Sequence, residues 1–329
     1  MKIILAPMDG LTDVYAREIL TSIGGYDFCV TEFLRVTDTL FPRRVFYRRF
    51  PELDPEQIKP GQKFSHTKSD VPVFLQLLGS DPSAMADNAL RAVQLGAMGI
   101  DLNFGCPAKT VNRRDGGASL LQFPQRIEQL VRAVRQSVPD NIPVTAKMRL
   151  GYQDQLLAHD NALAIQEGGA SWLTIHARTK KDGYRPPAYW EALAPIKQSL
   201  SIPLIANGEI WNVEDYFLCK ERSTCDDVML GRGAMVSFDL ALPIKCRVEN
   251  QPVARLNWPE ICMHLEQLYH LMDQNSALNK KYIAPRLKLW IKWLMPNFQQ
   301  AEDIFEPLKR IKDPQLAIQL IKNSAVAQE

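Results

Sequence analysis

Short apolar runs alternate with amphipathic segments along most of the chain. Runs with the length of buried strands occupy residues 3–8, 28–33, 71–79, 100–105, 143–151, 172–179, 203–210 and 227–234. Such continuous runs are typical of parallel strands that are covered on both faces. The segments between them, such as 82–97 and 124–138, place apolar residues at helical spacing. This alternation predicts an α/β fold, specifically a (β/α)8 TIM barrel.

A doubly wound sheet would also alternate, but its first strand is more often followed by a GxGxxG turn. Here that turn reads PMDGLTD and lacks the pattern. After residue 250 the strand-like runs stop, and the stretches 258–272, 285–295 and 313–321 have apolar residues at helical spacing only. We therefore expect two domains, a barrel at 1–248 and a small all-helical C-terminal domain at 249–329.

Composition, charge and cysteine spacing indicate which classes of protein this chain can belong to. The 329 residues carry 39 basic and 37 acidic side chains, so the net charge of +2 does not by itself indicate a nucleic-acid partner. The six cysteines are scattered without CxxC or CxxxH spacing, which predicts no metal site and a reducing compartment. The N-terminus is too weakly apolar for a signal peptide, and no run approaches a membrane span. We expect a cytoplasmic protein, with no membrane contact and no obligate protein partner evident.

Polar residues stand at the ends of nearly all the predicted strands. Barrel enzymes build their sites at the carboxyl ends of the strands and in the loops that follow. Unpaired polar groups in an apolar interior are costly, so their recurrence indicates a shared polar ligand. The residues at these positions are Met8, Asp9, Gln76, Asn103, Cys106, Lys147, Arg149, His176, Arg178, Asn207, Glu209 and Arg232.

The last two strands indicate a phosphorylated cofactor. Barrels often bind phosphate with glycine amides after strands seven and eight, and ANGEI and LGRGAM supply glycines at both places. Arg232 adds a permanent positive charge there. Lys147 and Gln76 would face the cofactor body, where a cation stabilises a ring that gains negative charge. This description fits flavin mononucleotide, FMN.

Several motifs together resemble the tRNA-dihydrouridine synthases. They are LAPMDGLTD, LQLLGSDP, DLNFGCPAKTV, KMRLG, IHARTK, IANGEI and MLGRGAM, and they span nearly the whole chain. The NxGCP element at 103–107 is the most specific of them. The chain is similar in particular to the bacterial C subfamily, whose target is uridine 16 in the tRNA D-loop. The stretch 47–70 matches no pattern that we recognise.

The resemblance implies a mechanism and a cofactor site. Flavin N5 gives a hydride to C6 of uracil, and Cys106 gives a proton to C5 from the opposite face; NADPH or NADH reduces the flavin. Gly105 and Pro107 shape the turn that carries the thiol. The other five cysteines are expected to be structural. The residues expected to bind FMN are Ala6, Pro7, Met8, Gln76, Lys147, His176, Asn207, Gly208, Glu209, Gly231 and Arg232.

A protein that binds tRNA requires basic groups that contact phosphates and side chains that pair or stack with bases. The segment 41–50 holds four arginines among aromatic residues, and 274–301 contains five basic residues and no acidic one. The resemblance implies that the helical domain binds tRNA. The residues expected to contact tRNA are Arg35, Asn103, Tyr184, Arg286, Lys288 and Lys309.

Two other functions remain open on sequence grounds. An FMN barrel oxidoreductase acting on a small molecule, similar to dihydroorotate dehydrogenase, would share the phosphate loops but would not need the basic helical domain. A non-catalytic RNA-binding protein on a degenerate barrel is disfavoured because Lys147, His176 and Cys106 are all present. A yellow purified protein would exclude the second of these.

Overall fold

The predicted barrel is present and closed. The computed structural model describes residues 1–58, 61–253, 255–276 and 278–326. Parallel pairings run from β1 through β9, β8, β7, β6, β5 and β4 to β2, which returns to β1. The strands are β1 (Ile3–Leu5), β2 (Phe28–Val30), β3 (Leu34–Arg35), β4 (Val73–Leu78), β5 (Ile100–Phe104), β6 (Val144–Gly151), β7 (Leu173–Thr179), β8 (Leu204–Asn207) and β9 (Val228–Leu230).

The second predicted strand, 28–33, is shorter than expected: β2 covers only its first three residues, and a separate short strand, β3, follows at Leu34–Arg35. β2 pairs with β4 at Cys29 and Val73, and β3 pairs with β4 further along, at Leu34 and Leu77. Between these two strands the Thr31 hydroxyl accepts the backbone N–H of Gln76 at 3.0 Å. A side-chain hydroxyl therefore takes the place of a backbone acceptor in the sheet there. Because β2 and β3 both pair with β4 at the same position around the barrel, the nine strands form an eight-stranded barrel.

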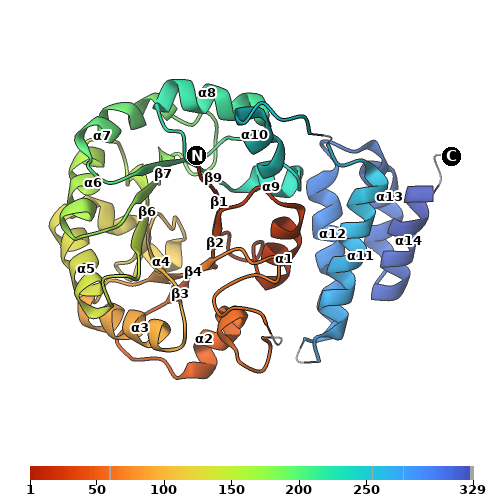
Figure 1. The fold of residues 1–329 in the computed structure, drawn as a ribbon, viewed down its shortest axis with the longest axis horizontal. Helices are drawn as coiled ribbons and strands as arrows, with labels where there is room; N and C mark the ends of the chain where they lie inside the picture. Colours follow the sequence, from red (N-terminus) through yellow and green to blue (C-terminus); the bar gives the residue numbers. More distant parts are fainter. Residues whose placement is uncertain (59–60, 254, 277, 327–329) are drawn as a thin grey trace. The chain divides into compact units, whose positions relative to one another are not determined.

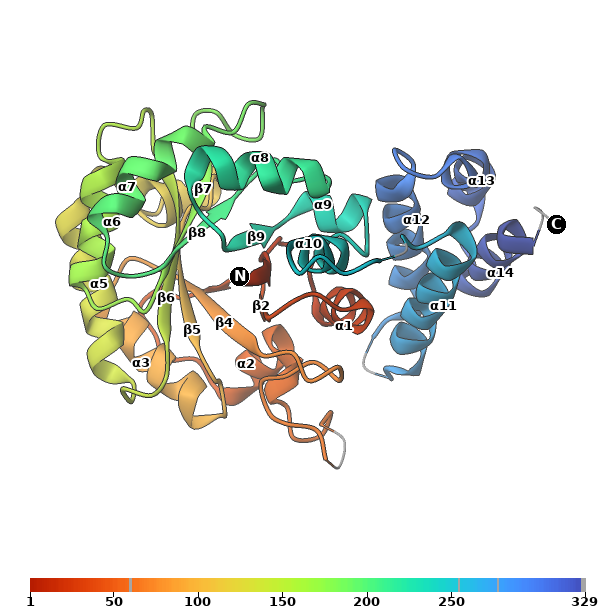
Figure 2. The ribbon, with the colours of Figure 1, turned by 45° about the horizontal axis from the view of Figure 1, so that its top comes forward.

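Helices cover the outside of this ring, as Figures 1 and 2 show. Asp81 caps α3 by accepting the N–H of Ala84 at 2.7 Å, and Pro82 opens the helix. The apolar stripe predicted in 124–138 is buried in α5. The elements between β3 and β9 are α2 (Arg43–Arg49), η1 (Pro51–Leu53), α3 (Pro82–Gln94), α4 (Lys109–Asn112), η2 (Gly117–Gln122), α5 (Pro124–Ser137), α6 (Ala158–Glu167), η3 (Trp190–Ala192), α7 (Leu193–Ser199) and α8 (Val213–Ser223), of which α4 and η2 belong to the connection after β5.

An apolar plug fills the amino-terminal end of the barrel. Phe28 and Phe74 stack with their ring centroids 5.0 Å apart, and Trp172 packs against both rings. The remaining side chains of this cluster are Ile4, Ala6, Val30, Ile205 and Met229. Because side chains alternate along a strand, the inward positions two residues beyond this layer are free for polar groups. The plug thus supports a polar layer at the carboxyl ends.

The contacts within the chain group it into two compact units. The first contains 1–14, 26–210 and 214–231, and the second contains 15–25, 211–213 and 232–329. The second unit thus includes α1 (Val14–Ile23) together with the helices after β9. Those are α9 (Arg232–Val236), α10 (Ala241–Val248), α11 (Trp258–Gln274), η4 (Lys280–Tyr282), α12 (Ile283–Leu294), α13 (Gln299–Arg310) and α14 (Pro314–Val326). A domain boundary at 248/249 stays a prediction.

The second unit has its own core and its own local signals. Asn257 and Glu260 form a reciprocal capping box at the start of α11. Leu265, Trp290 and Leu308 are fully buried in α11, α12 and α13. Within the described residues no helix is long and apolar enough to span a membrane. The same part of the chain contains no cluster of His, Cys, Asp and Glu side chains suited to a metal ion.

Candidate active site

The polar residues predicted at the strand ends lie in register around the barrel. Gln76 on β4 pairs with Asp101 on β5, and Asn103 on β5 pairs with Lys147 on β6. Further around, His176 on β7 pairs with Asn207 on β8. Paired positions in neighbouring parallel strands face the same side of the sheet. Five strands therefore bring these groups to one end of the barrel.

The segment 105–111, termed the Cys106 loop below, follows β5 directly. Asn103 Oδ1 accepts the backbone N–H groups of Gly105 and Cys106, both at 2.9 Å. On the other side Asn112 Nδ2 donates to the carbonyl of Cys106 at 2.9 Å and to that of Ala108 at 2.8 Å. A Cβ on Gly117 would lie 3.0 Å from the Cys106 Cβ, so glycine permits this close approach. The thiol is thus carried on a well-defined turn.

The environment of Cys106 favours the protonated thiol. Burial raises the pKa of Cys106, and the Asp9 carboxylate acts in the same direction. The Ala108 N–H, Arg149 and Arg35 act in the opposite direction and do not reverse the rise in pKa. A thiol with a raised pKa stays protonated at neutral pH, so it holds a proton that can be donated.

A chain of hydrogen bonds connects this loop to a buried acid. Asn103 Nδ2 donates to Gln76 Oε1 at 2.7 Å, and Gln76 Nε2 donates to Asp101 Oδ2 at 2.7 Å. The Thr145 hydroxyl donates to Asp101 Oδ1 at 2.5 Å. Asp101 is 2% exposed, and burial raises its pKa although these two hydrogen bonds and Lys147 lower it.

Lys147 is the cation of this polar layer. Burial and the nearby Arg149 lower the pKa of Lys147 to about 8, while Asp101 acts to raise it. Its ammonium group has no hydrogen-bond or ion-pair partner in the described part of the chain. A lysine in this state can donate to an anionic ligand with little competition from protein acceptors.

Arg149 links the Cys106 loop to the loop after β7. Its Nε donates to the Gly105 carbonyl at 2.9 Å, and its Nη1 donates to the Gly183 carbonyl at 2.8 Å. The guanidinium lies over the Tyr184 ring, 5.1 Å from the centroid. Tyr184 is 54% exposed, and its ring centroid lies 6.0 Å from that of His176. The Tyr184 ring is therefore held by contacts with Arg149 and His176 but remains accessible to solvent.

The loop after β8 is held tightly. Asn207 Nδ2 donates to the Met229 carbonyl at 2.7 Å, and Trp190 Nε1 donates to the Gly208 carbonyl at 2.9 Å. Glu209 has a positive φ of 57° and pairs with the buried Arg178 at 2.7 Å. Gly208 has a φ of +114°, and a Cβ there would lie 2.7 Å from the His176 ring. Glycine at 208 is thus required by both conformation and space.

The carboxyl ends of β1 and β9 lie side by side. The Ala6 N–H donates to the Leu230 carbonyl at 2.9 Å, and the Met8 N–H donates to the Thr12 hydroxyl at 2.7 Å. A Cβ on Gly231 would lie 3.6 Å from the Met8 sulfur. The predicted cofactor residues of the first and last strands, with Pro7 between Ala6 and Met8, therefore share one edge of the barrel.

Basic side chains surround this end of the first unit. Arg35 Nη2 donates to the Thr110 carbonyl of the Cys106 loop at 3.3 Å. Arg49, at the end of α2, pairs with Asp9 at 3.5 Å and with Glu32 at 3.3 Å, which follow β1 and β2. α2 therefore reaches the carboxyl-end rim of the barrel. The other basic residues of α2, the Cys106 loop and the turn after it are exposed: Arg43, Arg44, Arg48, Lys109, Arg113 and Arg114.

The remaining predicted residues belong to the second unit. Arg232 lies over the Trp211 ring, 4.9 Å from its centroid. Lys288 on α12 donates to the Lys309 carbonyl at 2.9 Å, so these two lysines are neighbours. Lys309 also pairs with Glu306 at 2.6 Å. Burial lowers the pKa of Arg286. Predicted tRNA residues on α12 and α13 thus lie together, but one of them is already paired with an acid.

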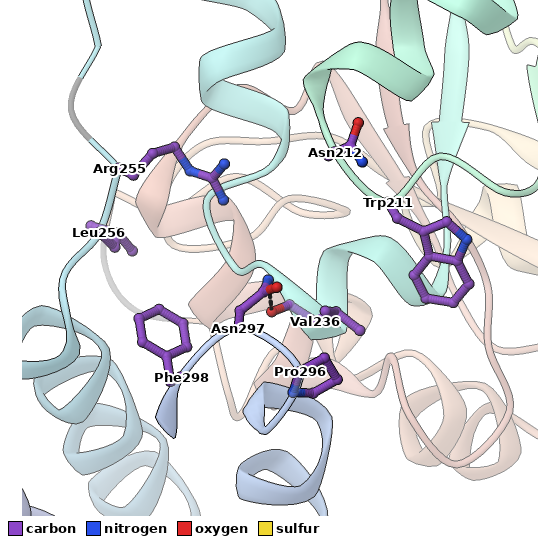
Figure 3. A pocket seen from close by; sticks show the side chains of 8 residues that line it. All are labelled: Trp211, Asn212, Val236, Arg255, Leu256, Pro296, Asn297 and Phe298. Carbon is purple, nitrogen blue, oxygen red and sulfur yellow. Dashed lines mark hydrogen bonds between the residues drawn. The ribbon is translucent and has the colours of Figure 1, made fainter. Parts of the chain in front are cut away.

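A pocket of about 600 Å³ lies within the second unit and is drawn in Figure 3. Two of its polar side chains serve neighbouring groups. Asn297 Nδ2 donates to the Val236 carbonyl at 2.9 Å, and Arg255 pairs with Asp239 at 2.8 Å. Sequence reasoning did not identify this pocket. Its lining residues are Trp211, Asn212, Val236, Arg255, Leu256, Pro296, Asn297 and Phe298.

Comparison with known proteins identifies the family. Residues 4–327 match the family described as Dihydrouridine synthase (Dus). The chain belongs to the dihydrouridine synthase family. Curated relatives named tRNA-dihydrouridine(16) synthase include that of Shewanella oneidensis, 44% identical over 98% of both chains. The one from Neisseria meningitidis serogroup A is 47% identical over 95% of this chain and 91% of its own.

A solved structure shows the same fold. The old yellow enzyme homologue from Zymomonas mobilis superposes with a TM-score of 0.50 at 12% identity, covering 77% of this chain and 90% of its own. The likeness supports the barrel architecture of this dihydrouridine synthase family member and nothing finer.

Three structural residues of this family member were missed or undervalued from sequence. Asp101 lies two positions before Asn103 in an apolar strand, and this period-two spacing could have placed both on the barrel interior. Arg149 was noted as polar but received no role. Asn112 carries no sequence signal, since its contacts with Cys106 and Ala108 depend on how the loop folds.

Proposed function

We propose that this chain reduces uridine to 5,6-dihydrouridine in the tRNA D-loop, at position 16. The curated relatives that bear this position in their names align along nearly the whole chain, which supports the choice of substrate. The observation that carries the proposal is the Cys106 thiol, protonated and fixed on a loop at the carboxyl end of the barrel. That is where barrel enzymes place their chemistry.

We infer that FMN is the cofactor and that NADPH, or NADH, reduces it. The Lys147 ammonium without a hydrogen-bond partner fits an anionic flavin ring. Gln76, His176 and Asn207 lie on the same end of the barrel. The residues after β1, β8 and β9 would hold the rest of the cofactor: Ala6, Pro7, Met8, Gly208, Glu209, Gly231 and Arg232. Glycine amides and an arginine are the usual partners of a phosphate.

The reaction adds one hydride and one proton across the C5–C6 double bond of uracil. The hydride to C6 would come from reduced FMN, held by the residues named above. Cys106 Sγ donates its proton to C5, and the resulting thiolate regains a proton from water. The raised pKa of Cys106 keeps the thiol loaded with its proton before each turnover. Lys147 supplies a positive charge, which stabilises negative charge near it.

The substrate residues divide between the two units. Tyr184 offers an exposed aromatic face on which an unstacked base can stack. Asn103 and Arg35 both form hydrogen bonds with the backbone of the Cys106 loop. Arg286, Lys288 and Lys309 supply positive charge for phosphates. We expect the enzyme to act in the cytoplasm, where tRNA is modified.

The test uses Cys106→Ala in the FMN-loaded enzyme. Stopped-flow absorbance separates reduction by NADPH from reoxidation by unmodified tRNA. We expect the variant to keep its flavin and its rate of reduction, and to lose nearly all reoxidation by tRNA. Wild-type reoxidation by the variant would contradict the role given to the thiol. A colourless protein that cannot be loaded with FMN would contradict the cofactor.

A further inference from the structure

A buried acid in the barrel has no part in the chemistry described above. Asp101 is 2% exposed and accepts hydrogen bonds from Gln76 and Thr145, and no ion pair joins it to Lys147. An ionised carboxylate in such a place costs free energy unless its hydrogen bonds compensate. An asparagine would have the same shape without an ionisable group, so the choice of an acid needs another explanation.

The acid fixes the direction of a whole chain of amides. Both carboxyl oxygens of Asp101 accept hydrogen bonds, one from Gln76 and one from Thr145, so Gln76 presents its amide nitrogen to Asp101. The Gln76 oxygen then faces Asn103, which must use its own nitrogen for that contact. The Asn103 oxygen is thereby left for the N–H groups of Gly105 and Cys106. Reversal of the chain would set the Asn103 nitrogen against two backbone donors.

The opposite side of the loop is held independently. Asn112 donates to the carbonyls of Cys106 and Ala108 through one nitrogen. Its oxygen is buried and has no partner among the described residues. A buried acceptor without a partner is unfavourable, so the two hydrogen bonds of the side-chain nitrogen must compensate for it. These two hydrogen bonds therefore hold Asn112 in its position.

We propose that Asp101, acting through Gln76 and Asn103, and Asn112, acting directly, are positioning residues that hold the Cys106 loop from its two sides. This rests on the proposed role of Cys106 as the proton donor. Proton transfer to carbon requires the thiol within close reach of C5, and a displacement of about 1 Å can cost roughly 10²-fold in rate. Neither residue touches the substrate in this account.

The test compares Asp101→Asn and Asn112→Ala in the FMN-loaded enzyme. An asparagine at 101 can present either end of its amide, so the direction of the chain is no longer enforced. We expect reoxidation by tRNA to slow about 10- to 100-fold in both variants, with little change in the tRNA affinity. Asn112→Ala does not alter the surroundings of Lys147, so its reduction by NADPH should equal that of the wild type.

A second readout does not depend on activity. Iodoacetamide labelling of the Cys106 peptide, followed by mass spectrometry over a range of pH, reports the exposure and the pKa of the thiol. A loosened loop exposes the thiol, so we expect labelling at least fivefold faster and a lower apparent pKa of Cys106 in both variants. Asp239→Asn is the matched control, since Asp239 is a buried acid of the second unit that binds Arg255. It should lower the melting temperature but leave labelling of Cys106 unchanged.

The outcomes separate this inference from the proposed function. If Cys106→Ala is inactive with tRNA but both variants label and turn over like the wild type, the positioning role is wrong and the function stands. If Cys106→Ala is active, the function fails, while the labelling result still decides whether the two residues hold the loop. Should Asp101→Asn fail to fold, Asn112→Ala alone decides, and wild-type labelling in it overturns the proposal.

Discussion

At the scale of single residues, the candidate site maintains charges and protons at a cost in stability. Lys147 has a pKa lowered to about 8 from the 10.5 of a solvated lysine, chiefly by burial. The folded state therefore binds this proton more weakly than the unfolded state. Protonation of Lys147 thus lowers the free energy of unfolding, and below pH 8 this cost is fully present at about 3 kcal/mol. The cost disappears as the pH rises from 8 through 10.5.

This predicts an unusual stability profile for Lys147→Met. The flavin-free variant should melt at a higher temperature than the flavin-free wild type at pH 7, because methionine carries no buried charge. The difference should shrink between pH 8 and pH 10.5, as measured by circular dichroism melts. The variant should also retain much less FMN. A variant that is less stable than the wild type at pH 7 would contradict the assignment of a strained, unpaired cation.

The sequence indicated which residues lie at the candidate site better than it indicated their contacts. Cys106 between Gly105 and Pro107 was recognisable from sequence as a special loop, and Lys147 and His176 as inward-facing polar groups. The positions of Gln76 and Asn103 were also predicted, but their bonds to each other and to Asp101 were not. Such bonds depend on the register between β4 and β5, which periodicity alone does not determine.

At the scale of elements, the loop after β8 illustrates how a short motif is supported. Gly208 adopts a φ of +114° beside the His176 ring. Gly208→Ala adds a strained backbone, of order 1–3 kcal/mol, and a clash with the ring. Gly183 is a matched control, because its φ is +65° but nothing lies within 4 Å of a Cβ there. Its replacement by alanine adds only the backbone strain.

We therefore expect Gly208→Ala to lower both the melting temperature and the FMN content clearly more than Gly183→Ala does. Flavin absorbance per mole of purified protein measures the second quantity. Equal effects of the two substitutions would mean that the contact with His176 does not constrain this loop.

The helix α2 allows a second test at this scale. It carries four arginines, and Arg49 anchors its end to Asp9 and Glu32 at the rim of the barrel. Arg43 and Arg44 are exposed and have no acidic partner within the described residues. We expect Arg43→Gln with Arg44→Gln to weaken tRNA binding and to reduce its salt dependence by roughly one unit of slope per lost phosphate contact.

Filter binding at several salt concentrations measures that slope. Arg222→Gln, an exposed charge in the last turn of α8, is the control. Helices of a barrel run opposite to the strands, so this position lies at the amino-terminal end, away from the candidate site. If the control and the double variant show the same slope as the wild type, α2 is only a solvated surface.

The element pattern was largely readable from the sequence. All eight apolar runs contain strands, and the stripe in 124–138 is buried as expected. The early end of the second strand and the separate strand β3 after it could not be predicted, because they depend on the Thr31 hydroxyl reaching the backbone of Gln76 across the sheet. The short α2 and the turns of 50–58 and 61–70 likewise follow from tertiary contacts, such as Ser65 with Val73, rather than from local periodicity.

At the scale of the whole molecule, a nearly neutral chain carries localised positive charge. The net charge is +2, yet basic residues gather on α2, after β5 and on α12. Uridines of the D-loop are chemically identical, so the choice among them must depend on how the whole tRNA is held. Phosphate contacts fix such a register without reading sequence.

We expect Arg286→Ala with Lys288→Ala to weaken tRNA binding and flatten its salt dependence, with FMN content and reduction by NADPH unchanged. Lys309→Ala should have a smaller effect, because Lys309 is paired with Glu306. An unchanged affinity and slope in the double variant would remove α12 from the tRNA-binding surface.

The most direct test of the account maps dihydrouridine in tRNA from a strain that lacks this gene. We expect dihydrouridine at position 16 to disappear while other D-loop positions keep theirs. A plasmid carrying the wild-type gene should restore it, and one carrying Cys106→Ala should not. Dihydrouridine persisting at position 16 in the deletion strain, or returning with Cys106→Ala, would contradict the account.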